Sequence, residues 1–166
     1  MKKNLVLLSM VLLVCCFSAC KKSTKPFVGE YTYQTDGRLT LTLDSEYNVP
    51  WTNLGQLQAL KDKDKKASLI LVYKSLLGDI STQNASVDGD VITCDEYVIT
   101  RNVDFQINDT LNVKGTAKIH VNSTGRLYDN TIIFDEDYSG LFYETNSSMI
   151  GTIKGDDIKT IAKLNN

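Results

Sequence analysis

The sequence has few of the residues on which common catalytic and metal sites depend. Its 166 residues include one histidine, His120, and no Cys-x-x-Cys pair, so a multi-histidine or paired-cysteine zinc site is excluded. His120 lies in no recognisable nucleophile motif, and the glycine patterns GxGxxG and GxxxxGK[ST] are both absent. We therefore expect a protein that is not an enzyme, with no catalytic residue, no metal and no cofactor.

An excess of charge of one sign is also lacking. Eighteen basic residues face 20 acidic ones, for a net charge of −2, and no basic patch with interleaved aromatic residues points to nucleic acid. The best acidic cluster is Asp135-Glu-Asp137. Carboxylates in a loop can hold Ca²⁺, but the spacing here does not match an EF-hand, and acidic residues are common in turns. We expect a turn rather than a calcium site.

Long hydrophobic runs are absent except at the N-terminus. Lys2 and Lys3 precede an apolar stretch from Leu5 to Val14, the order of charge and apolar residues that is typical of a secretory signal. The stretch is shorter than the roughly 20 apolar residues that a membrane-spanning helix needs. A short buried core helix is the alternative, which the abrupt change of composition after Cys20 disfavours.

The end of this run, Phe17-Ser-Ala-Cys20, resembles a bacterial lipobox. The resemblance implies a signal peptide at residues 1–19, cleavage after Ala19 and a lipidated Cys20, whose acyl chains would anchor the protein to a membrane. Residues 20–26 are polar and end in proline, which indicates a flexible tether. The sequence is similar to Bacteroidetes lipoproteins, and Lys21 and Lys22 replace the acidic cluster associated there with surface export. That similarity implies the periplasmic face of the outer membrane.

After the tether, the dominant hydrophobic period is two, which predicts β-strands with one wet face. Three runs show it best, at residues 38–43, 97–107 and 111–121. Further strands are expected at residues 29–35, 68–77, 90–94, 131–134, 140–143 and 149–154. Predicted turns are Thr35-Asp-Gly37, Val87-Asp-Gly-Asp90, Asn108-Asp109, Asn122-Ser-Thr-Gly125 and Lys154-Gly-Asp-Asp157.

One stretch departs from that period. Leu54, Leu57 and Leu60 are spaced three apart after Asn53, a possible N-cap. We expect one short helix near residues 53–61 that caps the sheet. A membrane-surface helix is the alternative, which the shortness of the apolar stripe and Gly55 disfavour.

Eight or nine short strands with hairpin turns predict an all-β fold, either an antiparallel up-and-down β-barrel or a sandwich. Phe27-Val-Gly-Glu-Tyr31, which opens the first strand, resembles the start of lipocalin-like (calycin-like) domains. The resemblance implies a single barrel domain over residues 27–164, with the Tyr31 ring closing its base. The family usually has tryptophan where this chain has tyrosine.

In such a small barrel, inward aromatic residues either fill the core or line a cavity. If a cavity exists, we expect it to be apolar, with Tyr97 and Phe105 in its wall and Arg101 meeting an anionic head group. The partner would then be a small apolar ligand or an envelope protein. The alternative is an accessory lipoprotein with a filled barrel and no ligand.

Three further residues have a predicted role or environment. Asp109-Thr110-Leu111 resembles the O-glycosylation motif of Bacteroidetes, which implies a glycan on Thr110. Cys94 has no partner for an intramolecular disulfide once Cys20 carries lipid, and we expect it to be a buried structural residue. His120 alternates with apolar residues of its strand and should face solvent.

Overall fold

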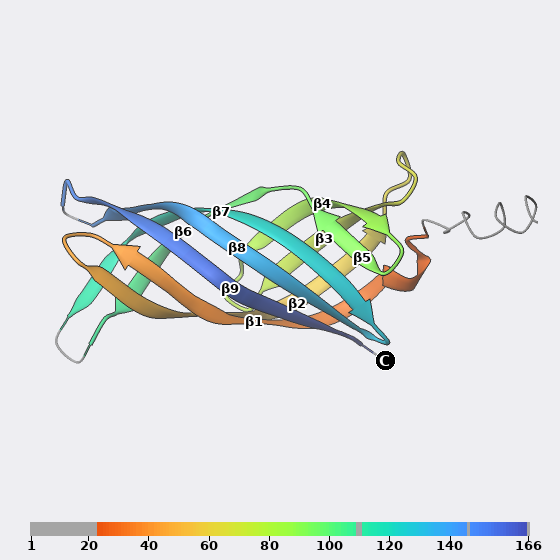
Figure 1. Ribbon diagram of the computed structural model, residues 1–166, viewed down its shortest axis with the longest axis horizontal. Coiled ribbons are helices and arrows are strands. Elements are labelled where there is room, and N and C mark those ends of the chain that lie inside the picture. Colours follow the sequence, from red (N-terminus) through yellow and green to blue (C-terminus); the bar gives the residue numbers. More distant parts are fainter. Residues whose placement is uncertain (1–22, 109–110, 146, 166) are drawn as a thin grey trace, which may run out of the picture.

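The computed structural model describes residues 23–108, 111–145 and 147–165. They form an all-β antiparallel structure with almost no helix (Figure 1). A 3₁₀ turn, η1 (Lys25–Phe27), precedes nine strands: β1 (Gly29–Thr42), β2 (Glu46–Lys61), β3 (Ser68–Ser75), β4 (Ile80–Asp88), β5 (Val91–Cys94), β6 (Tyr97–Gln106), β7 (Asn112–Tyr128), β8 (Thr131–Glu144) and β9 (Ile150–Leu164).

The nine strands form one sheet in the order β5-β4-β3-β2-β1-β9-β8-β7-β6. Neighbours in the sheet are also neighbours in the chain, except that β9 returns to β1. A further pairing of Val91–Thr93 on β5 with Thr124–Arg126 on β7 closes eight strands into a hydrogen-bonded ring. β6 pairs only with β7, beyond the point where β5 ends. The ring is therefore complete where β5 pairs with β7, and it is interrupted toward the other end of the sheet, next to β6.

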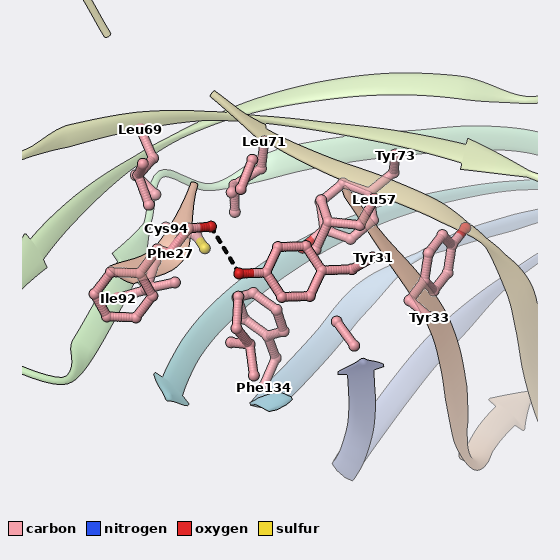
Figure 2. Packing of buried hydrophobic residues seen from close by; sticks show 14 of the residues in the cluster. Phe27, Tyr31, Tyr33, Leu57, Leu69, Leu71, Tyr73, Ile92, Cys94 and Phe134 are labelled. Carbon is pink, nitrogen blue, oxygen red and sulfur yellow. Dashed lines mark hydrogen bonds between the residues drawn. The ribbon is translucent and has the colours of Figure 1, made fainter. Parts of the chain in front are cut away.

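Alternating burial explains why these segments form strands. In β7 the side chains of Val113, Ala117, Ile119 and Val121 are buried while their neighbours are more exposed, which is the pattern of a sheet with one wet face. The inward residues form two apolar clusters. One surrounds Phe27, Tyr31 and Phe134 (Figure 2), and the other surrounds Leu39, Ile119 and Phe142. Each fully buried large apolar side chain contributes about 1.5–3 kcal/mol to folding.

The expected helix near residues 53–61 is wrong, because this segment belongs to β2. Leu57 is 1% exposed and pairs with Tyr31 of β1 and Tyr73 of β3. Leu54 and Leu60, at three residues on either side, are 45% and 39% exposed. In a strand, a spacing of three places side chains on opposite faces. The segment had partners on both sides, and this pairing outweighed a leucine spacing that suited a helix.

Three of the predicted turns also lie inside strands. Thr35–Gly37 is part of β1, Asn122–Gly125 of β7, and Lys154–Asp157 of β9. Two of these segments coincide instead with irregularities of the ladder: β1 and β9 shift register between Asp36 and Thr40, and Asp157 has a positive φ of 60°. Polar and glycine residues here bend long strands, as β-bulges do, without ending them.

The predicted turn at Val87–Asp90 is confirmed. Asp88 and Val91 flank the tight connection of β4 to β5, where Gly89 has a φ of 65°. β6 and β7 are paired as predicted, and the connection is closed by the amide of Ile107 donating to the carbonyl of Leu111. Residues 109 and 110 of this connection lie outside the described residues. No strand was predicted at β4.

The N-terminal end of the described chain packs against the first apolar cluster. Thr24 is buried, Phe27 is fully buried, and the Tyr31 hydroxyl donates a 2.8 Å hydrogen bond to the Phe27 carbonyl (Figure 2). The folded structure thus includes residues 24–26, which the sequence analysis assigned to the tether. Cys20 and the signal segment lie outside the described residues. In the described part of the chain, no helix is long and apolar enough to span a membrane.

Candidate ligand-binding cavity

A cavity of about 340 Å³ lies beside the free edge of β6, where members of both apolar clusters meet polar side chains. Its wall combines four tyrosines with two acidic side chains and one basic one: Tyr33, Tyr73, Tyr97, Tyr138, Asp79, Glu136 and Arg101. Hydroxyl and amide groups of Thr35, Asn53, Ser75 and Thr160 complete the polar part. The expectation of an apolar cavity is therefore wrong, because the cavity has a polar interior.

Side chains alternate between the two faces of each strand, and this alternation places the wall residues on the inner face. On β8, Ile132, Phe134, Glu136 and Tyr138 are all buried, while Asp135 and Asp137 between them are exposed. On β6, Tyr97, Ile99, Arg101, Val103 and Phe105 share the more buried face. Because β6 pairs on one side only, its inward side chains border the opening of the ring rather than a sealed core.

Glu136 is the most unusual member of the wall. Its side chain is 4% exposed, and Oε2 accepts a hydrogen bond of 3.0 Å from the Tyr138 hydroxyl and another of 3.0 Å from the Thr160 hydroxyl. The Thr35 and Thr160 hydroxyls lie 2.6 Å apart. Since Thr160 donates its only proton to Glu136, Thr35 must be the donor to Thr160. Burial raises the pKa of Glu136 to about 7, although the hydroxyl donors act in the opposite direction.

No basic side chain in the described part of the chain is paired with Glu136. The ion pairs of the described residues all lie at the surface and none includes it. A buried carboxylate without a cationic partner is costly, and the usual response is a raised pKa. At neutral pH the group is therefore close to the midpoint of its titration.

The tyrosines come from four different strands and contact one another. Tyr33 and Tyr73 meet edge to face with ring centroids 5.4 Å apart, and Tyr73 is stacked on Tyr97 at 6.4 Å. The Tyr33 hydroxyl accepts a hydrogen bond from the Asn53 amide at 3.1 Å. The buried Tyr73 hydroxyl has no hydrogen-bond partner. Burial raises the pKa of Tyr33, Tyr73, Tyr97 and Tyr138 above the ordinary value, so all four stay protonated.

Arg101 lies at the mouth of the cavity. Its guanidinium carbon is 3.9 Å from the centroid of the Trp51 ring, a close cation–π contact. Partial burial lowers the pKa of Arg101, and the negative charge of Asp79, another residue of the wall, acts against that shift. Trp51 in turn meets Tyr138 edge to face at 5.8 Å. The guanidinium is thus held on Trp51, and none of the ion pairs of the described residues joins it to Glu136.

Phe105 does not line this cavity. It is buried in the second apolar cluster, with its ring centroid 6.0 Å from that of Phe142. It borders a separate open groove of about 420 Å³ between Pro50–Thr52 on β2 and Arg101–Phe105 on β6. The structure therefore brings two of the three predicted residues, Tyr97 and Arg101, into one cavity and places the third beside it.

Exposed apolar side chains lie around the opening. Ile80 and Val98, which border the cavity, are 68% and 45% exposed, and Leu77, which borders the groove, is 77% exposed. Large exposed apolar residues that gather around a concave site are typical of binding surfaces.

The remaining candidates of the sequence analysis lie away from the cavity. His120 is on the outer face, 3.0 Å from Glu96 through its Nδ1. Asp135 and Asp137 belong to β8 and lie on the face opposite to that of Glu136, so the expected turn is wrong. Among the described residues, no three His, Cys, Asp or Glu side chains form a group that could hold a metal ion. Cys94 is buried as expected, and burial raises its pKa to about 12. Thr110 lies outside the described residues.

No known family model matches this chain, and no curated protein matches it.

Glu136 is the residue that sequence reasoning missed. It was read with Asp135 and Asp137 as part of a polar turn. The signal that could have found it is the alternation of Ile132, Phe134, Tyr138 and Phe142, which continues through position 136. A carboxylate in the apolar register of a strand is rare and has functional meaning more often than one on the wet face.

Proposed function

We propose that the protein is a non-enzymatic, membrane-anchored lipoprotein of the cell envelope whose lipocalin-like barrel binds a small molecule. The cavity beside Glu136 is the observation that carries this proposal. Its volume of about 340 Å³ falls within the range of small-molecule sites, and its wall has the few convergent polar groups that orient a ligand. The ligand would be amphipathic, with its polar end inside and its apolar part against the rim formed by Ile80 and Val98.

The closed ring of hydrogen-bonded strands supports the barrel part of the proposal. β9 returns to β1, and β5 meets β7, so the sheet has few free edges. Tyr31 and Phe27 pack together at one end of the ring, which suits the base-closing role that the resemblance implies.

Native mass spectrometry of the protein purified from its own cells tests ligand binding. We expect a retained small molecule in the wild type and in the control Ser86→Trp, whose side chain is on the exposed face of β4. Ser81→Trp, on the same strand but in the wall of the cavity, should lose it. A wild type without any retained mass, and without binding to a library of small amphipathic compounds, would favour the alternative of an accessory lipoprotein with a filled barrel.

The anchor is proposed to be a lipid on Cys20 that holds the domain at the periplasmic face of the outer membrane. The lipobox-like Phe17-Ser-Ala-Cys20 supports it. We expect wild-type protein to incorporate labelled palmitate and to partition into detergent, and Cys20→Ser to do neither. Protease treatment of intact cells should leave the protein uncut; digestion there would place it on the cell surface instead.

Thr110 is proposed to carry an O-glycan, on the basis of Asp109-Thr110-Leu111. The motif falls between β6 and β7 in the chain, and Asp109 and Thr110 lie outside the described residues. Mass spectrometry of the native peptide should show added hexose units that are missing in Thr110→Ala. An entirely unmodified peptide would rule this modification out.

A further inference from the structure

The electrostatics of the cavity indicate the chemical class of its ligand. Glu136 and Asp79 are the acidic residues of the wall. Arg101, the basic one, lies on the Trp51 ring and takes part in none of the ion pairs of the described residues. The charge of Glu136 acts on Tyr33, Tyr73, Tyr97 and Tyr138, whereas the carboxylate whose charge acts on Arg101 is that of Asp79. Glu136 is therefore a buried acidic group among aromatic rings, and no cation of the described residues forms an ion pair with it.

A second observation points to a missing hydrogen-bond partner. The hydroxyl of Tyr73 is fully buried and has no partner in the structure. A buried polar group left unpaired is costly, and such groups in native proteins call for a specific explanation. Tyr73 lines the same cavity as Glu136, so one guest can satisfy both.

The aromatic surroundings favour a cation rather than a neutral donor. Tyr33, Tyr73, Tyr97 and Tyr138 surround the interior on β1, β3, β6 and β8, with Tyr73 in ring contact with both Tyr33 and Tyr97. The electron-rich faces of aromatic rings attract ammonium groups, and several rings around one site are a known means of binding them. An ammonium group also has three N–H donors, enough for a carboxylate oxygen and a tyrosine hydroxyl together.

We propose that the cavity binds the protonated amino group of a small organic amine, with Glu136 as its counter-ion and the Tyr73 hydroxyl as a second acceptor. This inference rests on the proposed function, since it specifies the ligand of the same cavity. The apolar part of the amine lies toward Ile80 and Val98 at the mouth.

Binding of such an amine depends on pH through Glu136. An alkylamine stays protonated at pH 6–8, whereas the pKa of Glu136 is about 7. The groups that face this carboxyl are Tyr138 on its own strand, Thr160 on β9, Ser123 on β7, Cys94 on β5, Tyr33 on β1, Tyr73 on β3 and Tyr97 on β6. Raised pKa values keep the tyrosines and Cys94 protonated across this range. Asp79 and Arg101 are the charged groups at the mouth. Only the ionised carboxylate pairs with the ammonium, so affinity should rise about tenfold from pH 6 to pH 8.

Isothermal titration calorimetry with two probes of the same shape tests the inference. The probes are 2-phenylethylamine and its neutral counterpart 2-phenylethanol. We expect the amine to bind at least tenfold more tightly than the alcohol at pH 8. Glu136→Gln should remove this preference and the pH dependence, and Asp137→Asn, its exposed neighbour on β8, should keep both.

A second variant guards against loss of folding in Glu136→Gln. Tyr73→Phe removes only the unpartnered hydroxyl, and it should weaken amine binding at least threefold while circular dichroism stays unchanged. Equal affinity for amine and alcohol, no amine binding at all, or undiminished amine binding in both variants overturns the inference. The proposed function would still stand if the native molecule lost by Ser81→Trp were neutral or anionic, and it would fall separately if no native molecule were found.

Discussion

The hydroxyl of Thr160 on β9 donates a 3.0 Å hydrogen bond to the carboxylate of Glu136 on β8, and both side chains are almost fully buried. Glu136 pairs in the ladder with Ile158, two residues before Thr160. The relationship therefore follows from the register of two adjacent strands. It fixes the position of the Glu136 carboxylate among aromatic side chains. The expected dependence of stability and ligand binding on pH follows from this position.

Stability should fall as pH rises through the range in which Glu136 ionises. Its pKa is about 7 in the folded protein and about 4.3 when unfolded. The folded state thus binds more protons between those values, and the stabilisation is present below pH 4 and lost as pH rises through 7. The free energy of unfolding should include a fall of about 3 kcal/mol across this window.

Urea denaturation at pH 5 and pH 8 measures that change. Glu136→Gln should flatten the dependence, and Asp137→Asn should leave it as in the wild type. The difference in unfolding free energy between Glu136→Gln and wild type should be compared at the two pH values. The assignment would be contradicted if the variant were less stable, relative to wild type, at pH 8 than at pH 5.

The unpaired hydroxyl of Tyr73 should cost the empty protein stability. Tyr73→Phe removes that hydroxyl and keeps the ring that stacks on Tyr97 and meets Tyr33. We expect ligand-free Tyr73→Phe to be more stable than wild type by about 1–2 kcal/mol in urea denaturation. The control is Tyr128→Phe, at an exposed residue, which should change nothing. A destabilised Tyr73→Phe protein would mean that the hydroxyl already has a partner.

The contact of Arg101 with Trp51 should be visible in fluorescence, because Trp51 is the only tryptophan. Arg101→Met removes the cation from the ring face and should change the intensity and wavelength of Trp51 emission, with a stability loss of about 1 kcal/mol. Arg126→Met, at an exposed residue of β7 paired with Asp90, is the control. Identical spectra for wild type and Arg101→Met would show that the guanidinium does not lie on Trp51.

Gly55 should be irreplaceable because of close packing in β2. A β-carbon at this position would collide with the Lys74 carbonyl oxygen of β3 and lie 2.8 Å from Cε1 of Tyr33. We expect Gly55→Ala to destabilise the protein by about 1–3 kcal/mol or more and to displace Tyr33 from the cavity wall. Gln56→Ala, next to it and exposed, should have little effect. Thermal unfolding monitored by circular dichroism compares the two, and equal midpoints would refute the packing.

The sequence predicted the class of fold and most strand positions, because alternation is a local property of each segment. It failed where strands were longer than their apolar runs. β1 and β8 continue through Asp36-Gly37 and Asp135–Ser139, since neighbouring strands pair with these residues on one side or on both. The helix near residues 53–61 failed for the same reason, as three leucines satisfied a helical spacing that pairing with β1 and β3 overrode.

The cavity could be predicted only in part. Tyr97 and Arg101 share a face of one strand, which alternation revealed. Tyr33, Tyr73 and Glu136 come from three other strands, and only closure of the ring brings them together. The predicted apolar character was wrong because Glu136 and Thr35, which were expected in turns, and Thr160, which no predicted element included, occupy inward positions.

A crystal structure of the protein with 2-phenylethylamine at pH 8 tests the central claim most directly. We predict the amine nitrogen within about 2.7–3.2 Å of a carboxylate oxygen of Glu136, with the Tyr73 hydroxyl as a second partner and the phenyl group toward Ile80. An amine bound only outside the cavity, or an occupied cavity in which the nitrogen faces away from Glu136, would contradict the account.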